Sequence, residues 1–190
     1  MKGRGPVPLA VRLGAALVAS ALLGACGEGP PPGPPLPPAP AWTPERTAEA
    51  RTLATRLSAL PEASPGEIRV HLAFGPEVDL DVYVTGPLEE TVYYANTPSG
   101  IGGELLEDRR CAHEGVRIET VRFPLRPGPY RVGVDYPLAC GGGEKPAPFA
   151  LLVETPGGRE RLRGLAVHQV FEPVVLEFDL EPETDPEVTR

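Results

Sequence analysis

An antiparallel β-sandwich of about seven to nine short strands is the fold that the sequence predicts for residues 67–182. From residue 67 onward, apolar and polar residues alternate with a period of two, which is typical of strands that bury one face. Turn sequences rich in glycine and proline separate the alternating segments at intervals of about 8 to 15 residues. Helices do not alternate with these segments, so the pattern favours an all-β fold over a parallel sheet.

The expected strands share this alternation. They are residues 67–74, 80–84, 92–95, 116–123, 130–136, 149–154 and 174–180. Arg159, Arg161 and Arg163 also alternate, after a Gly-Gly turn. We interpret them as an edge strand that charge protects from pairing, with an anionic envelope polymer or lipid head group as the alternative. Residues 183–190 are expected to form a disordered tail.

The composition disfavours two broad classes of protein. Glycine and proline number 22 and 26 of the 190 residues, and because both interrupt helices, a helical bundle is not expected. The formal net charge is −8, with only 18 Lys and Arg residues. A surface that neutralises the phosphates of a nucleic acid is therefore not expected either.

Residues 1–25 have the features of a bacterial lipoprotein signal peptide. Its basic start consists of Lys2, Arg4 and Arg12. The small, apolar run that follows is too short, as a helix, to cross the ~30 Å hydrocarbon core of a bilayer. The run ends in Leu-Gly-Ala-Cys26, which resembles a lipobox and predicts that Cys26 carries acyl chains that anchor the protein to a membrane. Gly27, rather than Asp, follows the cysteine, and the same resemblance then favours the outer membrane of the cell envelope. An ordinary secretory signal with an incidental cysteine is the alternative.

A proline-rich tether and one amphipathic helix are expected between this anchor and the sandwich. Residues 26–41 contain eight prolines, and such a segment stays extended as a spacer of roughly 40–45 Å. Thr43 is a candidate N-cap for a helix over residues 44–59, within a helix-and-linker segment of residues 42–66. The alternatives are that the tether binds a proline-recognition module and that the helix binds a partner.

Cys111 and Cys140 are the two cysteines that remain once Cys26 is lipidated. An exported chain reaches an oxidising compartment, so we predict a disulfide between them. The alternative is a zinc site that uses Cys111 and His113.

Asp79 and Asp81 are the strongest indication of a functional site in the sequence. Two residues apart on a strand, they project from one face about 7 Å from each other along the chain, and like charges so placed repel unless water or a cation compensates. A hard cation such as Ca²⁺ needs six to eight oxygens. We expect Asn96, Asp108 and Glu119 to add ligands to the two aspartates. The alternative is an acidic, solvated sheet face that binds nothing.

A series of motifs follows in order between residues 67 and 180. They are Val78-Asp79-Leu80-Asp81-Val82-Tyr83-Val84, Tyr93-Tyr94-Ala95-Asn96, Gly102-Gly103 with Asp108, Ile118-Glu119-Thr120-Val121 and Pro127-Gly128-Pro129-Tyr130-Arg131-Val132-Gly133-Val134-Asp135-Tyr136. In this order they resemble the YfaP-like domain of unknown function of bacterial exported proteins. Two of the motifs are also similar to the pre-peptidase C-terminal sandwich, some members of which bind Ca²⁺. The resemblance implies an exported β-sandwich and supports a cation at the Asp79/Asp81 loop, without implying a catalytic activity.

The sequence predicts a non-catalytic module rather than an enzyme. It contains no Gly-x-Ser-x-Gly motif, phosphate-binding loop or dinucleotide fingerprint. We expect an envelope lipoprotein with a binding or accessory β-sandwich, Ca²⁺ as its candidate cofactor, and a membrane, an envelope protein or a glycan as its partner. Tyr83, Tyr93 and Tyr94 are candidates for stacking on a sugar, with cross-strand packing as the alternative. The competing hypotheses are a purely structural lipoprotein and a metal-dependent hydrolase that uses the acidic loop.

Overall fold

The computed structural model describes residues 39–141 and 143–182 of the chain. The predicted signal peptide, Cys26, most of the proline-rich tether and the tail at 183–190 lie outside the described residues. Within the described part, no helix combines the length and apolar character needed to cross a membrane.

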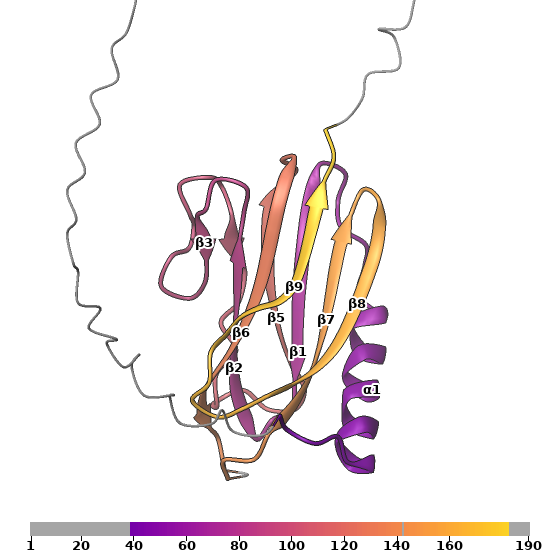
Figure 1. Cartoon of the computed structure of the whole chain (residues 1–190), viewed down its shortest axis with the longest axis vertical. Coiled ribbons are helices and arrows are strands. Elements are labelled where there is room, and N and C mark those ends of the chain that lie inside the picture. The colour runs from indigo at the N-terminus through magenta and orange to yellow at the C-terminus, as the bar shows by residue number, and fades with distance from the viewer. Residues whose placement is uncertain (1–38, 142, 183–190) are drawn as a thin grey trace, which may run out of the picture. The chain divides into compact units, whose positions relative to one another are not determined.

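Helix α1 (Pro44–Ser58) precedes the strands and begins where the sequence predicts. The Thr43 hydroxyl caps it by accepting a hydrogen bond from the backbone N–H of Arg46 at 3.3 Å, and proline is tolerated at the first position because its missing N–H would be unpaired there. Leu53 and Leu57 are buried on one side of the helix. They pack against the sheet that contains Ala150 and Leu152, so α1 covers the outer face of that sheet (Figure 1).

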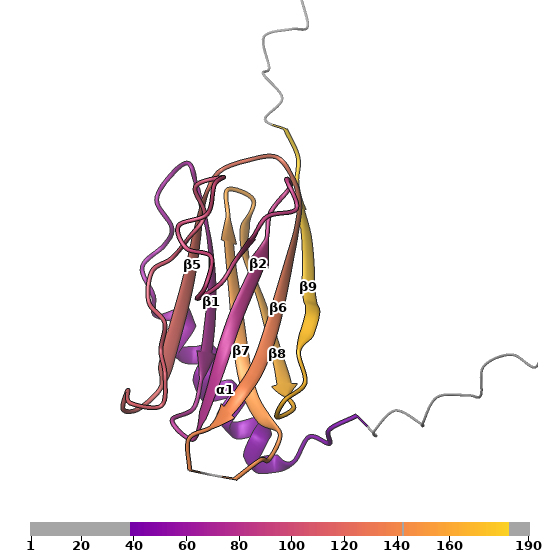
Figure 2. The ribbon, with the colours of Figure 1, turned by 90° about the vertical axis from the view of Figure 1, so that its left-hand side faces the viewer.

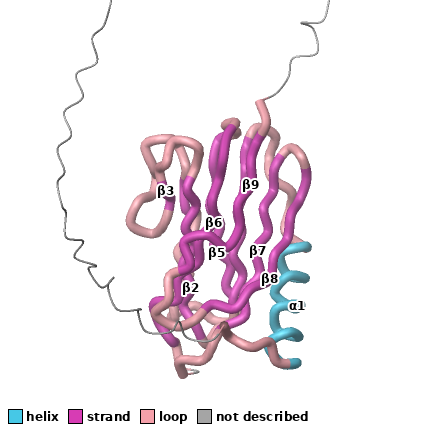
Figure 3. The backbone as a smooth tube through the Cα atoms, viewed as in Figure 1, coloured by secondary structure: helices cyan, strands magenta, loops and turns pink. Residues whose placement is uncertain are grey.

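Two antiparallel sheets form the rest of the described chain, as predicted (Figure 3). The first sheet has the order β4-β5-β1-β7-β8, with bounds β1 (Glu67–Phe74), β4 (Glu104–Leu105), β5 (Arg117–Pro124), β7 (Ala147–Thr155) and β8 (Gly158–Ala166). The second sheet has the order β3-β2-β6-β9, with bounds β2 (Val78–Thr85), β3 (Thr91–Val92), β6 (Gly128–Ala139) and β9 (Glu172–Leu180). The two sheets pack face to face as an all-β sandwich, and in Figure 2 β5 and β1 of the first sheet lie on the side opposite β9 of the second.

The core lies between the two sheets and is built from the alternating residues of each strand. On β1 and β2 its members are Ile68, Val70, Leu72, Phe74, Leu80, Val82 and Val84, all fully buried. A second, smaller cluster lies between the first sheet and α1. The period of two in the sequence thus separates core residues from outward-facing ones.

Two short strands differ from expectation. The strand expected at 92–95 ends after Val92, because Tyr93 and Asn96 pair across a tight turn instead. Strand β4 is only two residues long, too short to produce a visible alternation. Both differences lie in the segment that connects the two sheets, where the chain follows turns rather than a long strand.

One side of β2 is open over much of its length. Strand β3 pairs only with Val84 and Thr85, and β6 takes the other side. The loop of residues 106–116, between β4 and β5, is tied to the end of β6 by a disulfide between Cys111 and Cys140, with Cα atoms 5.2 Å apart. The predicted disulfide is therefore present, and it excludes Cys111 as a zinc ligand.

Candidate cation site

Glu119 places a carboxylate inside the sandwich. On β5 it belongs to the inward row that also contains Val121 and Phe123, and its side chain is 1% exposed. Its Oε2 accepts a hydrogen bond from the backbone N–H of Val82 at 3.1 Å, and its Oε1 accepts one from the N–H of Arg109 at 3.0 Å. Glu119 therefore joins the first sheet to the edge of β2 and to the 106–116 loop.

Three carboxylates converge at this edge from separate elements. Asp81 on β2, Asp108 in the 106–116 loop and Glu119 on β5 each offer an oxygen, and these oxygens all lie within 4.8 Å of one another. We call these three residues the acidic cluster. Residues so far apart in sequence meet because the loop folds back over the edge of β2 toward β5.

Asp79 stands next to the acidic cluster with an unpaired oxygen. Its side chain is 7% exposed, and among the described residues no group hydrogen-bonds to its buried Oδ1. The buried Oδ1 of Asp108 has no such partner there either, although its Oδ2 accepts a hydrogen bond from Nε of Arg110 at 2.7 Å. A buried acceptor without a donor is costly, so these oxygens mark a place where a cation would be stabilising.

The charges of the cluster disturb one another. The pKa of Asp81 is raised to about 7, because burial disfavours its charged form and because Asp79, Asp108 and Asp135 repel it. Burial also raises the pKa of Glu119 to about 8, against two backbone hydrogen bonds that favour the ionised form. The pKa of Asp79 is raised for the same leading reason, burial, with repulsion from Asp108 in addition.

Arg117 is buried nearby but does not pair with these carboxylates. Its guanidinium donates to the backbone oxygens of Val78, Cys111 and His113, and the side chain is 2% exposed. It thereby fastens the disulfide-bonded loop to the start of β2. Its charge lowers the pKa of Asp79 by less than either burial or Asp108 raises it, so the pKa of Asp79 stays above its ordinary value.

The structure brings four of the predicted ligands together, namely Asp79, Asp81, Asp108 and Glu119. The side-chain amide nitrogen of Asn96, the fifth predicted ligand, donates to the backbone oxygen of Thr91 at 2.7 Å. The two aspartates of β2 are only 7% and 8% exposed, which is less exposure than the alternative of a solvated acidic face predicts. The register interruption between Asp79 and Asp81 shows that β2 is irregular there.

Sequence reasoning missed two charged neighbours of the site. Asp135 faces Asp81 across the β2–β6 pair, and Arg110 binds Asp108. The only available signal was the alternation of β6, which places Asp135 on the outward row but does not identify its partner strand. Arg110 lies in a loop, where periodicity gives no information.

The donor set fits a hard divalent cation. Ca²⁺ binds oxygens at about 2.3–2.6 Å, so two oxygens on one ion can be as much as about 5 Å apart. The spacing within the acidic cluster satisfies this limit. Asp79 and Asp81 also line a shallow surface depression with Tyr94, Arg110 and Leu138, which gives an ion access from solvent.

These features define an all-β sandwich with a carboxylate cluster at the open edge of one sheet. Comparison of the chain with protein-family models, with curated proteins and with solved structures gave no significant match. The resemblance to the YfaP-like domain accordingly stays a hypothesis.

Proposed function

We propose that the protein is a bacterial envelope lipoprotein whose β-sandwich is a non-catalytic binding module stabilised by Ca²⁺. The ion would be held by Asp81, Asp108 and Glu119, with Asp79 as a fourth carboxylate. The lipobox-like sequence at Cys26 supports a lipid anchor, and Gly27 after it favours the outer membrane. In the sequence, the proline-rich tether precedes α1.

The convergence of the acidic cluster is the observation that carries the proposal. Carboxylates within 4.8 Å of one another in a mostly buried setting must be neutralised by protons or by a cation. Both oxygens of Glu119 accept backbone hydrogen bonds, which favour the ionised carboxylate, while burial raises its pKa to about 8. A bound cation would offset the effect of burial and hold Glu119 in the ionised form that these hydrogen bonds favour.

Ca²⁺ suits this donor set better than Mg²⁺ does. The ligands come from two strands and a loop, and Ca²⁺ tolerates the irregular, flexible coordination that such an origin produces. Mg²⁺ requires near-ideal octahedral geometry and usually keeps several waters. The four carboxyl groups leave further coordination positions for backbone oxygens, water or a ligand.

The same geometry favours a structural ion over a hydrolytic one. Glu119 is 1% exposed, and both of its carboxylate oxygens accept hydrogen bonds from backbone N–H groups. It is therefore poorly placed to act as a general acid or base on a substrate. Its contacts tie two sheets and a loop together, as expected of a ligand that stabilises the fold.

Thermal unfolding of the full-length protein in Ca²⁺ and in EDTA tests the proposal. At 100-fold over the dissociation constant, the ion would stabilise the protein by about 2.7 kcal/mol, a shift of several degrees. The shift should disappear in Asp81→Asn and persist in Asp179→Asn, which removes an exposed aspartate from β9. Equal unfolding temperatures in millimolar Ca²⁺ and in EDTA would overturn the proposal.

A further inference from the structure

An aromatic row lies on the outer face of the second sheet, beside the acidic cluster. It consists of Tyr83, Tyr93, Tyr94 and Phe171, whose rings contact one another in sequence. Phe171 and Tyr83 have centroids 4.7 Å apart, Tyr83 stacks on Tyr93 at 5.0 Å, and Tyr93 meets Tyr94 edge-on at 5.3 Å. Since Tyr83 follows Asp81 by two residues, the row and the cluster share one face of β2.

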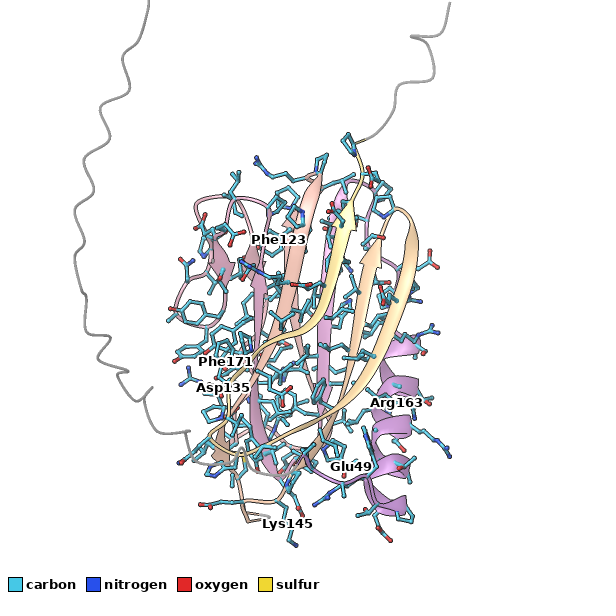
Figure 4. All side chains as sticks on the ribbon, in the orientation of Figure 1. Glu49, Phe123, Asp135, Lys145, Arg163 and Phe171 are labelled. Carbon is cyan, nitrogen blue, oxygen red and sulfur yellow. A yellow bond between two sulfur atoms is a disulfide. The ribbon has the colours of Figure 1, made fainter. Side chains whose placement is uncertain are left out.

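The ends of the aromatic row are open to solvent. Tyr94 is 46% and Phe171 47% exposed. The stacked pair of Tyr130 and Phe178 is different, because Tyr130 is only 1% exposed and belongs to the core. Figure 4 shows Phe171 and Asp135 on the side of the molecule away from α1. Cross-strand packing therefore accounts for part of the row and leaves large ring faces uncovered.

Gly133 allows Phe171 to reach this position. It pairs with Tyr83 across the β2–β6 ladder, and a Cβ at Gly133 would lie 2.9 Å from the backbone oxygen of Pro173. The chain at the start of β9 therefore passes directly against Gly133, where the β6–β9 register shifts. This close approach brings Phe171 onto Tyr83. It requires glycine at position 133, because any side chain there would meet the backbone of Pro173.

Two surface depressions meet along the row. Tyr83, Tyr93 and Phe171 line one of them, together with polar groups from Thr85, Thr91 and Arg131. Tyr94 lines the other, with Asp79, Asp81 and Arg110. Tyr93 and Tyr94 contact each other, so this ring pair connects the linings of the two depressions, which together offer ring faces, hydroxyls and carboxylates.

We infer that this surface binds a glycan chain of the cell envelope. The inference rests on the proposed function, because a bound Ca²⁺ would offer open coordination positions to a pair of neighbouring sugar hydroxyls. Sugar rings present C–H groups on their faces and hydroxyls at their rims. The C–H faces would lie on Tyr94 and Phe171, while Thr85, Thr91 and Arg131 meet hydroxyls at the rim. A protein partner would instead favour a broad apolar centre with a polar rim, whereas here a single row of rings is flanked by hydroxyls, an arginine and carboxylates.

The test is binding of the full-length protein to an array of immobilised envelope oligosaccharides that includes isolated peptidoglycan, in Ca²⁺ and in EDTA. We expect binding in Ca²⁺ only. Phe171→Ala and Tyr94→Ala should each weaken it about ten-fold while leaving the Ca²⁺-dependent unfolding shift unchanged. Trp42→Ala is the matched control, since Trp42 is an equally exposed aromatic residue at 48% that precedes α1.

The possible failures are distinguishable. No binding to the array despite an intact Ca²⁺-dependent unfolding shift would overturn the glycan inference and leave the cation site standing. Binding that persists in EDTA, or that Phe171→Ala and Tyr94→Ala leave unchanged, would also overturn the inference. Loss of the unfolding shift itself in the unsubstituted protein would remove the proposed function and the inference with it.

Discussion

Glu119 accepts a hydrogen bond from the backbone N–H of Val82, which lies on the opposite sheet. This contact satisfies a donor on the side of β2 that β3 does not cover. In proteins generally, open strand edges are protected from pairing by charged side chains or by a covering loop. In this protein the buried carboxylate of Glu119 occupies the open edge of β2, and the same carboxylate belongs to the acidic cluster.

Glu119→Gln should destabilise the protein and remove its response to Ca²⁺. An amide can offer an oxygen to only one of the two backbone donors, so the other buried N–H loses its partner at a cost of about 1–3 kcal/mol. Thermal unfolding in EDTA would measure this cost, and isothermal titration with Ca²⁺ would measure the lost affinity. Glu177→Gln, an exposed position on β9, is the control. Full retention of Ca²⁺ binding in Glu119→Gln would contradict the assigned ligand set.

The Ca²⁺-free protein should lose stability as the pH rises. Asp81 and Glu119 have folded-state pKa values of about 7 and about 8, above those of an unfolded chain. The folded state therefore binds more protons than the unfolded state at intermediate pH. The contribution of these two groups to the free energy of unfolding is present at low pH and declines through about pH 5 to 8. In saturating Ca²⁺ the decline should be reduced, because the ion replaces the protons. Unfolding temperatures recorded across this range in EDTA should fall less steeply for Asp81→Asn than for the unsubstituted protein, and equal slopes would count against the pKa assignments.

Loss of the disulfide should weaken both the fold and the cation site. Cys111 and Cys140 are 29 residues apart, and closing a loop of that size contributes roughly 3–4 kcal/mol in the chain-entropy model. The crosslinked loop also carries Asp108, so Cys111→Ser/Cys140→Ser should bind Ca²⁺ less tightly as well as unfold at a lower temperature. Unchanged Ca²⁺ affinity in the double variant would indicate that the loop keeps its position without the crosslink.

Arg117→Lys should destabilise the protein by about 1–3 kcal/mol without abolishing the response to Ca²⁺. A lysine ammonium keeps the charge but cannot present the planar set of donors that reaches the carbonyls of Val78, Cys111 and His113. Arg122→Lys provides the control, since Arg122 is an exposed residue of the same strand. Denaturant unfolding in EDTA would compare the two, and equal midpoints would argue against a fastening role for Arg117.

Cys26→Ser should abolish acylation and release the protein from membranes. The lipobox-like sequence predicts thioether-linked diacylglycerol on the Cys26 sulfur, and a serine hydroxyl cannot replace the thiol in that step. Mass spectrometry of the N-terminal peptide from membrane-extracted protein would detect the modification. An unmodified Cys26 in native protein would refute the lipid anchor.

Much of the fold could be predicted because its signals are local. The period of two along β1 identifies Ile68, Val70, Leu72 and Phe74 as core, and the Thr43 cap marks the start of α1. The disulfide followed from the count of cysteines. These features depend on neighbours in sequence, which is why composition and spacing suffice to find them.

The arrangement of the site could not be predicted in the same way. Alternation shows that Glu119 shares a row with Val121, but not that its carboxylate meets an uncovered N–H on the other sheet. Asp135 faces Asp81 only because β6, rather than another strand, lies beside β2. Such contacts depend on strand order, which a single sequence does not encode locally.

The disulfide-bonded loop bears on the proposed export. Thiols remain reduced in the cytoplasm, so in a chain exported as we propose the Cys111–Cys140 bond would form after translocation. Without that bond, the loop that carries Asp108 keeps the hydrogen bonds of Arg117 and Glu119 but loses its covalent link to the end of β6. Under the proposed export, the native state would therefore be less stable before translocation than after the bond has formed.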